Sequence, residues 1–149
     1  MGCEMCKYEI KDSIQLKQIE VKTGSYKQIQ KKYTLNSKIL GSGNFGKVFL
    51  AHNMADPAFK VAIKTIPKHK LSSSIEQLKE EIKILSKLDH PNIIKYYETY
   101  ESPKYLYVVM EYCSGGELFE KLAHNPEAFT EAFVRKIMYK LFLAVNHCH

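Results

Sequence analysis

The sequence has little that would mark a secreted or membrane-spanning chain. It holds no apolar run near the roughly 18 residues that a membrane span requires, and no hydrophobic segment of the kind found in secretory signals. Its four cysteines are too few and too scattered for a disulfide framework: Cys3, Cys6, Cys113 and Cys148. We therefore expect a cytoplasmic protein whose fold does not depend on disulfides.

Strong charge of one sign is also missing. The formal net charge of +6 is spread along the chain, which favours an ordinary solvated surface, although an anionic membrane face or acidic partners would also suit it. We expect no nucleic-acid partner. What the chain does have is 45% hydrophobic residues, with ten Tyr and seven Phe, and its 149 residues are enough for one domain with a real core.

Residues 1–33 differ from the rest of the chain. Seven lysines stand against four acids there, with scattered isoleucines and no clear period, so we predict a flexible or partly helical basic arm. The globular part is expected to begin near Tyr33, with the domain boundary between residues 33 and 34.

A glycine-rich run, Gly-Ser-Gly-Asn-Phe-Gly-Lys-Val at residues 41–48, precedes Val-Ala-Ile-Lys at residues 61–64. Three glycines in six positions let a backbone bend over a polyphosphate, because no Cβ atom holds the main-chain N–H groups away from its oxygens. Lys64, on a following strand, would supply the opposite charge. Together the two motifs predict a site for nucleotide phosphates.

Other glycine-rich loops fit this segment less well. A dinucleotide-binding loop leads into a helix and has an acid about 20 positions later, whereas the period-two alternation here predicts strands on both sides of the turn-rich residues 53–57. A Walker-type loop needs Ser or Thr where Val48 stands, and a helix after it. The remaining alternative is an ordinary glycine-rich hairpin turn without a ligand.

Residues 73–88 are predicted to form an amphipathic helix. Ser73 or Ser74 would begin it in a capping box, and apolar residues recur at helical spacing. Glu81 falls on the row of Leu78 and Leu85, which places a carboxylate in the buried stripe, where it needs a cation. Lys64 is the predicted partner. The alternative is that Glu81 lies at the edge of the stripe and reaches solvent.

Two further strands are predicted at residues 93–97 and 105–110, on either side of a turn at residues 101–104 and after a break at His90-Pro91-Asn92. The remainder is predicted to be helical, with a short helix opened by residues 114–117 and a longer one capped by Thr130. The longer helix would carry a wide apolar face: Phe133, Val134, Ile137, Met138, Leu141, Phe142 and Val145. His147 and His149 flank Cys148, but their spacing fits no standard metal site, and we predict none.

From about Tyr33 to the last residue, these motifs and their order resemble the protein kinase family. The amino-acid sequences of residues 88–95 and of Gly-Gly-Glu-Leu-Phe at 115–119 are most similar to those of calcium-dependent protein kinases, within the calmodulin-regulated group. The resemblance implies an α+β fold. A protein-kinase N-lobe, with a five-stranded antiparallel sheet plus one helix, would occupy residues 34–112. A hinge and the first helices of a truncated α-helical C-lobe would follow in residues 113–149.

The resemblance also implies the role of each candidate site residue. The loop over the phosphates would comprise Gly41, Ser42, Gly43, Asn44, Phe45, Gly46 and Lys47, and adenine would pack on Leu40, Val48 and Ala62. Lys64 would hold the α and β phosphates of ATP while paired with Glu81, and these two are the implied catalytic residues. Met110 would be the gatekeeper. The Glu111 carbonyl and the Cys113 main chain would face the adenine edge, and Glu117 would reach the ribose, although Ser114-x-x-Glu117 also fits a capping box.

The family's H-R-D-L-x-x-x-N, D-F-G and A-P-E segments are not in this sequence. We therefore expect that this polypeptide alone does not transfer phosphate, and that the ligands of Mg²⁺ lie outside this chain. No D-x-D-x-D-G calcium loop occurs either, so a calcium-sensing region is expected on missing sequence or on a partner. The leading hypothesis is the nucleotide-binding part of a Ser/Thr kinase acting on protein substrates. The alternative is a non-catalytic nucleotide-binding or membrane-tethered interaction module.

The N-terminus, Met-Gly-Cys, is typical of a doubly acylated protein. Gly2 would carry myristate after removal of Met1 and Cys3 would carry palmitate, so that two chains and a basic arm together hold the protein at an anionic membrane surface. Cys6 stands where the myristoylation pattern prefers Ser or Thr. The alternative is that Cys3-x-x-Cys6 forms half of a zinc or redox motif, although no second pair is present.

Overall fold

The structure is a computed structural model, and it describes residues 22–23, 26–43, 46–70 and 75–149. Several predictions concern residues outside these ranges and stay predictions: acylation at Gly2 and Cys3, the loop positions Asn44 and Phe45, and the helix caps Ser73 and Ser74.

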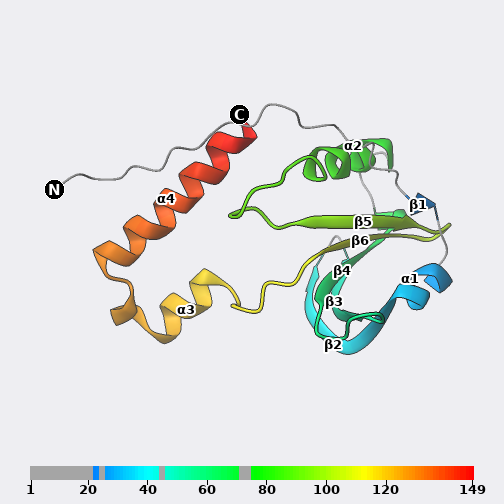
Figure 1. The fold of residues 1–149 in the computed structure, drawn as a ribbon, viewed down its shortest axis with the longest axis horizontal. Helices are drawn as coiled ribbons and strands as arrows, with labels where there is room; N and C mark the ends of the chain where they lie inside the picture. Colours follow the sequence, from blue (N-terminus) through cyan, green and yellow to red (C-terminus); the bar gives the residue numbers. More distant parts are fainter. Residues whose placement is uncertain (1–21, 24–25, 44–45, 71–74) are drawn as a thin grey trace.

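In the described part of the chain, six strands form one sheet with the order β1-β5-β6-β4-β3-β2 (Figure 1). The strands are β1 (Lys22–Thr23), β2 (Tyr33–Gly43), β3 (Gly46–Asn53), β4 (Lys60–Pro67), β5 (Tyr96–Glu101) and β6 (Tyr105–Glu111). Strands β2 to β6 pair antiparallel, as predicted, and the two-residue β1 adds a parallel edge next to β5.

The limits of β5 differ from the prediction, which placed that strand at residues 93–97. The break at His90 extends further along the chain than expected, because the Ile93 N–H donates to the His90 carbonyl at 3.0 Å and the Asn92 N–H donates to His90 Nδ1 at 3.1 Å. These bonds hold Ile93 in a turn. The strand therefore begins at Tyr96 and continues to Glu101.

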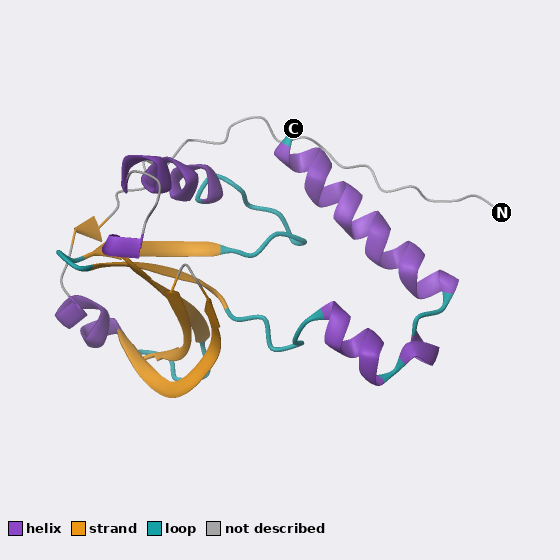
Figure 2. Cartoon of the chain, turned by 180° about the vertical axis from the view of Figure 1, so that it is seen from behind, coloured by secondary structure: helices purple, strands orange, loops and turns teal. Residues whose placement is uncertain are grey.

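The two faces of the sheet are covered by different helices (Figures 1 and 2). Helix α1 (Tyr26–Lys32) lies on one face, where its Ile29 is buried. Helix α2 (Ile75–Leu85) lies on the other, where its Ile82 is buried. The core on the α1 face comprises Ile29, Tyr33, Ala51, Val61, Ile63, Tyr100, Tyr107 and Val109. The core on the α2 face comprises Ile66, Ile82, Tyr96, Leu106 and Val108, with Leu78, Leu85 and Met110 packed against it.

The last part of the predicted arm nevertheless packs against the sheet as helix α1. Ile29 in α1 and Tyr33, the first residue of β2, both belong to the buried core on this face. Ile29 is fully buried, and the removal of its apolar side chain from water stabilises the packing of α1 on the sheet.

A buried carboxylate also ties α1 to the sheet. Glu98 on β5 accepts a hydrogen bond from the Tyr33 hydroxyl at 2.5 Å and forms an ion pair with Lys32 Nζ at 2.8 Å. Burial raises the pKa of the Glu98 carboxyl, but the hydrogen bonds from Lys32 and Tyr33 outweigh it and hold that pKa below its ordinary value. Burial and the neighbouring carboxylate raise the pKa of Tyr100 to about 12.

The rest of the chain is helical, as predicted. The 3₁₀ helix η1 (Lys68–Lys70) follows β4. After β6 come α3 (Leu118–His124), the 3₁₀ helix η2 (Pro126–Ala128) and α4 (Glu131–Cys148). Thr130 caps α4 as expected, because its hydroxyl accepts a hydrogen bond from the Phe133 N–H at 3.3 Å.

Helix α4 leaves most of its predicted apolar face in solvent, with exposed fractions from 38% at Phe133 to 63% at Phe142. Near its C-terminal end the ring of His147 lies 5.1 Å from the ring of His90, in the loop that follows α2. Among the described residues, no helix is long and apolar enough to cross a membrane.

Candidate functional site

Strand pairing aligns Gly41 and Lys64, two of the candidate phosphate contacts, in one row of residues that crosses four strands. Gly41 on β2 pairs with Val48 on β3, Val48 pairs with Lys64 on β4, and Lys64 pairs with Val108 on β6. Residues directly opposite each other on neighbouring strands point to the same face. Because Val108 belongs to the core under α2, the whole row lies on the α2 face of the sheet.

A second row, two residues along each strand, brings the adenine candidates to the same face. Leu50 pairs with Ala62, and Ala62 pairs with Met110, which packs against the core under α2. Val48 is half-buried and Ala62 is 7% exposed. Leu40 is half-buried in β2, but a register shift between Ile39 and Gly41 means that pairing does not fix its direction. The register thus gathers five of the predicted contacts: Gly41, Val48, Ala62, Lys64 and Met110.

The structure requires glycine at one of the three glycine positions of the loop and not at the other two. Gly46 has a φ of 117°, and a Cβ atom there would lie 1.8 Å from the Thr65 carbonyl oxygen. Glycine is therefore required at 46 by the close approach of β4. At Gly41 and Gly43 a Cβ atom would meet no atom within 4 Å. The fold leaves open space beside these two, so no contact among the described residues requires glycine at either position.

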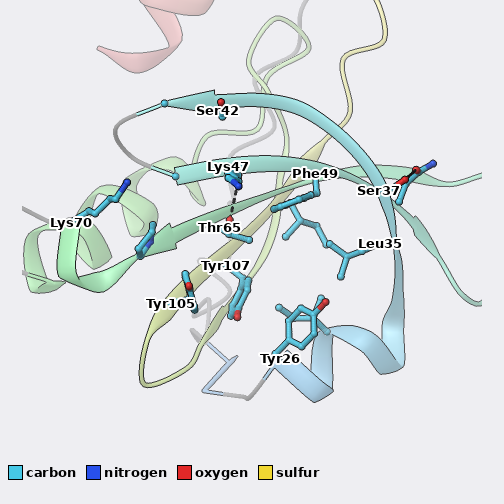
Figure 3. A pocket seen from close by; sticks show the side chains of 16 residues that line it. Tyr26, Leu35, Ser37, Ser42, Lys47, Phe49, Thr65, Lys70, Tyr105 and Tyr107 are labelled. Carbon is cyan, nitrogen blue, oxygen red and sulfur yellow. Dashed lines mark hydrogen bonds between the residues drawn. The ribbon is translucent and has the colours of Figure 1, made fainter.

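The other loop positions divide between the two faces of the sheet. Ser42 and Lys47 pair with each other, and both line a cavity on the α1 face (Figure 3). Their side chains therefore point away from the row of Lys64, and only their backbone remains available to the predicted nucleotide. The Thr65 hydroxyl donates to the Lys47 carbonyl at 3.1 Å, which attaches this end of β3 to β4.

The predicted burial of Glu81 is wrong. Its side chain is exposed, and none of the ion pairs among the described residues joins it to Lys64. Each helical residue is rotated by about 100° from the one before it, so the orientation that buries Ile82 turns Glu81 to the edge of the apolar stripe. The alternative reading of Glu81, at the stripe's edge and in solvent, holds in this structure.

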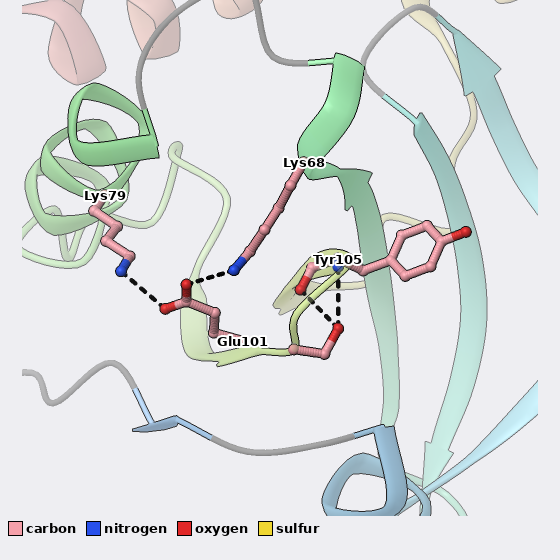
Figure 4. A network of polar contacts seen from close by, with 5 residues as sticks. Lys68, Lys79, Glu101 and Tyr105 are labelled. Carbon is pink, nitrogen blue, oxygen red and sulfur yellow. Dashed lines mark hydrogen bonds and ion pairs between the residues drawn. The ribbon is translucent and has the colours of Figure 1, made fainter.

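A polar network that the sequence did not reveal attaches α2 to the sheet (Figure 4). Glu101, at the end of β5, accepts from Lys68 Nζ at 2.6 Å and from Lys79 Nζ at 2.9 Å. The bonds from Lys68 and then Lys79 hold the pKa of the Glu101 carboxyl below its ordinary value. Lys79 is two residues before Glu81 on α2, so this network helps to set the rotation of the helix that carries the candidate catalytic glutamate.

The segment after β6 contains the remaining candidates. The Glu111 N–H donates to the Lys95 carbonyl at 2.8 Å, and the Glu111 side chain accepts from the Lys95 N–H at 3.1 Å. Cys113 is an exposed free thiol. Glu117 is the N-cap residue of α3 and makes no side-chain cap hydrogen bond, so the capping box with Ser114 does not form. Among the described residues, no group of three or more His, Cys, Asp or Glu is placed to hold a metal ion.

Comparison with known proteins agrees with this geometry. The chain is 45% identical over 121 residues to calcium-dependent protein kinase 5 of Plasmodium berghei (strain Anka), an alignment that covers 81% of this chain and 21% of that protein. It is 38% identical over 121 residues to calcium/calmodulin-dependent protein kinase type 1 of Caenorhabditis briggsae, covering 81% of this chain and 33% of that protein. The chain thus spans between a fifth and a third of the length of these two relatives.

A solved structure shares the fold as well. The crystal structure of Rad53 1–466 in complex with AMP-PNP superposes with a TM-score of 0.71 at 30% sequence identity, and the match covers 81% of this chain and 31% of that one. The family model for the protein kinase domain matches residues 33–149, which include every described element from β2 onward. The chain therefore belongs to the protein kinase family, and the part it contains is the small lobe with the first helices of the large one.

Proposed function

We propose that this chain is the nucleotide-binding part of a calcium-dependent Ser/Thr protein kinase that transfers phosphate from ATP to protein substrates. The observation that carries the proposal is the row of Gly41, Val48 and Lys64 on one face of the sheet, with open space beside Gly41 and Gly43. A cation opposite a bare backbone is suited to a polyphosphate, and the AMP-PNP bound to Rad53 supports the same ligand class.

In phosphoryl transfer the protein mainly positions its substrates and neutralises the charge of the transferring group. Here Lys64 would neutralise phosphate charge, and the backbone at Gly41 and Gly43 would approach the phosphates from above. Ala62 and Val48 would contact the adenine ring, with Met110 behind them. Mg²⁺ would supply further positive charge at the phosphates. We propose that this chain contributes phosphate and adenine contacts and that the metal ligands come from other sequence.

Nucleotide binding is tested with two neighbouring substitutions on opposite faces of β2. Gly41→Val fills the open space on the face of Lys64, so we expect the affinity for a fluorescent ATP analogue to fall on the order of tenfold, at about 1.4 kcal/mol per factor of ten. Ser42→Val places the same side chain on the α1 face and should leave the affinity within about twofold. Equal affinities for the two variants would remove the Lys64 face as the nucleotide site.

The enzymatic part of the proposal needs the full-length protein. Lys64→Met should abolish phosphorylation of a peptide substrate while leaving the far-UV circular dichroism spectrum unchanged, since Lys64 is replaced by a side chain of similar length. Unchanged phosphorylation would refute the role given to Lys64.

Calcium dependence is supported by the names of the relatives, and a chelator tests it separately. The wild-type protein should lose most of its peptide phosphorylation when EGTA removes calcium and regain it when calcium is restored. Activity that persists in EGTA would contradict calcium dependence and leave the kinase assignment standing.

A further inference from the structure

The cavity on the α1 face of the sheet takes no part in the proposed nucleotide site. Its volume is about 810 Å³ (Figure 3). Ile63 and Thr65 of β4 line it, and because successive strand residues point to opposite faces, Lys64 lies on the other side of the sheet. Ile29 and Ile63 are fully buried beneath it, and Tyr107 is 7% exposed. Cavities of about 300–1,000 Å³ with mostly apolar walls are typical of small-molecule sites. The size and the lining therefore suit a ligand with an apolar body.

The charges around this cavity all have one sign. Among the described residues, Lys47 and Lys70 are the only charged ones that line it, and no described Asp or Glu does. Both lysines are exposed, and in the described part of the chain neither has an ion-pair partner. Hydroxyl and amide groups complete the lining at Ser37, Ser42, Thr65 and Asn36. An organic cation would be repelled here, whereas an anionic group would gain two partners.

We propose that this cavity binds a small organic carboxylate with an aromatic or aliphatic body. The body packs on Ile63 and Tyr107, and the carboxylate lies at the rim beside Lys47 and Lys70. Tyr26 and Tyr105, exposed by 43% and 39%, provide aromatic walls at the opening. A neutral apolar molecule uses only the floor of the cavity, and an inorganic anion uses only its rim. The combination of floor and rim selects an amphipathic anion.

The same hairpin forms part of this cavity and of the nucleotide site. Gly43, Gly46 and Lys47 line the cavity, whereas Gly41 and Val48 belong to the row on the other face. A ligand in the cavity therefore contacts the outer side of the glycine loop, and its binding changes the affinity of the inner side for nucleotide. This coupling rests on the proposed function, while binding of the carboxylate does not.

Binding is tested with 1-naphthaleneacetate and its neutral counterpart, 1-naphthaleneacetamide, added to the isotope-labelled 149-residue chain. We expect the acid to shift the amide resonances of Lys47, Thr65 and Tyr107. The double variant Lys47→Gln, Lys70→Gln should bind the acid roughly three- to tenfold more weakly, because exposed ion pairs are individually weak. The amide should bind both proteins equally. The matched control is Lys60→Gln, which changes an exposed lysine at the start of β4 outside the cavity lining.

Several results would overturn the proposal: equal affinity of the acid for wild type and double variant, equal loss in the Lys60→Gln control, or resonance shifts confined to the exposed apolar face of α4. The coupling is measured separately, as the affinity for a fluorescent ATP analogue with and without saturating 1-naphthaleneacetate. A change of at least about threefold supports it, and no change refutes the coupling while leaving the carboxylate site. If the chain binds no nucleotide, the proposed function fails, but the resonance shifts still decide the cavity.

Discussion

Removal of one hydroxyl group should measurably loosen the attachment of α1 to the sheet. Tyr33 is 3% exposed and donates to Glu98, which is 7% exposed, at 2.5 Å. Tyr33→Phe keeps the ring in the core and deletes only this bond. A hydrogen bond to a charged group contributes about 1.5–3 kcal/mol. Since Lys32 still pairs with Glu98 in the variant, we expect a loss of about 2 kcal/mol.

Thermal unfolding followed by far-UV circular dichroism measures this loss. At about 2–4 °C per kcal/mol for a chain of this size, the midpoint should fall by about 4–8 °C at pH 7. Tyr105→Phe is the matched control, because Tyr105 is 39% exposed. Its unfolding free energy should change by less than about 0.5 kcal/mol. A midpoint for Tyr33→Phe equal to that of wild type would refute the assigned bond.

The pH dependence gives the same prediction a second readout. The folded pKa of Glu98 is held below its ordinary value, so its stabilising contribution is present above the unfolded pKa of about 4.3 and is lost as the pH falls through the folded value. The difference between wild type and Tyr33→Phe should therefore shrink below about pH 4. A difference that stays constant down to pH 2 would contradict the role of the ionised carboxylate.

Three further predictions concern the α2 attachment, the glycine loop and the N-terminus. Glu101→Gln should lower the unfolding free energy by about 1–2 kcal/mol, because it weakens the bonds to Lys68 and Lys79, whereas Glu80→Gln, in an exposed pair with Lys83, should change it by less than about 0.5 kcal/mol in the same urea titration. Equal losses in the two variants would contradict the network. Gly46→Ala should lower the unfolding midpoint well below that of Gly43→Ala, since only position 46 places a Cβ atom against Thr65, and similar midpoints would show that the hairpin adjusts freely. In cells given a myristate analogue, label should be incorporated into the wild-type protein and not into Gly2→Ala, and label that is absent from both would end the acylation hypothesis.

Local patterns were sufficient to predict most of the sheet. Period-two alternation around the turn-rich residues 53–57 identified the strands on both sides, which pair antiparallel in the structure. The face shared by Ala62 and Lys64 was also predictable, because residues two apart on a strand point to the same side. These are properties of neighbouring residues, which the sequence displays directly.

Contacts between distant elements were not predictable in the same way. Lys68, Lys79 and Glu101 come from η1, α2 and β5, and no local pattern marks them as partners. A partly helical arm was predicted, but the packing of α1 on the sheet was not, because its one fully buried residue, Ile29, lies among lysines. The burial of Glu81 was misjudged because helical spacing predicts which face of a helix is buried only to within about one residue position. For a residue at the edge of the apolar stripe, an error of one position decides whether its side chain lies in the core or in solvent.

The contrast between the glycines also separates what the fold needs from what the proposed nucleotide would need. Gly46 is fixed by the passage of β4 beside it, whereas Gly41 and Gly43 face open space. If Gly41 and Gly43 serve the proposed nucleotide, a related chain that binds none would be free to replace these two and would still have to retain Gly46. The pattern of loss at these three positions can therefore act as a record of whether a lineage has kept its ligand or only its architecture.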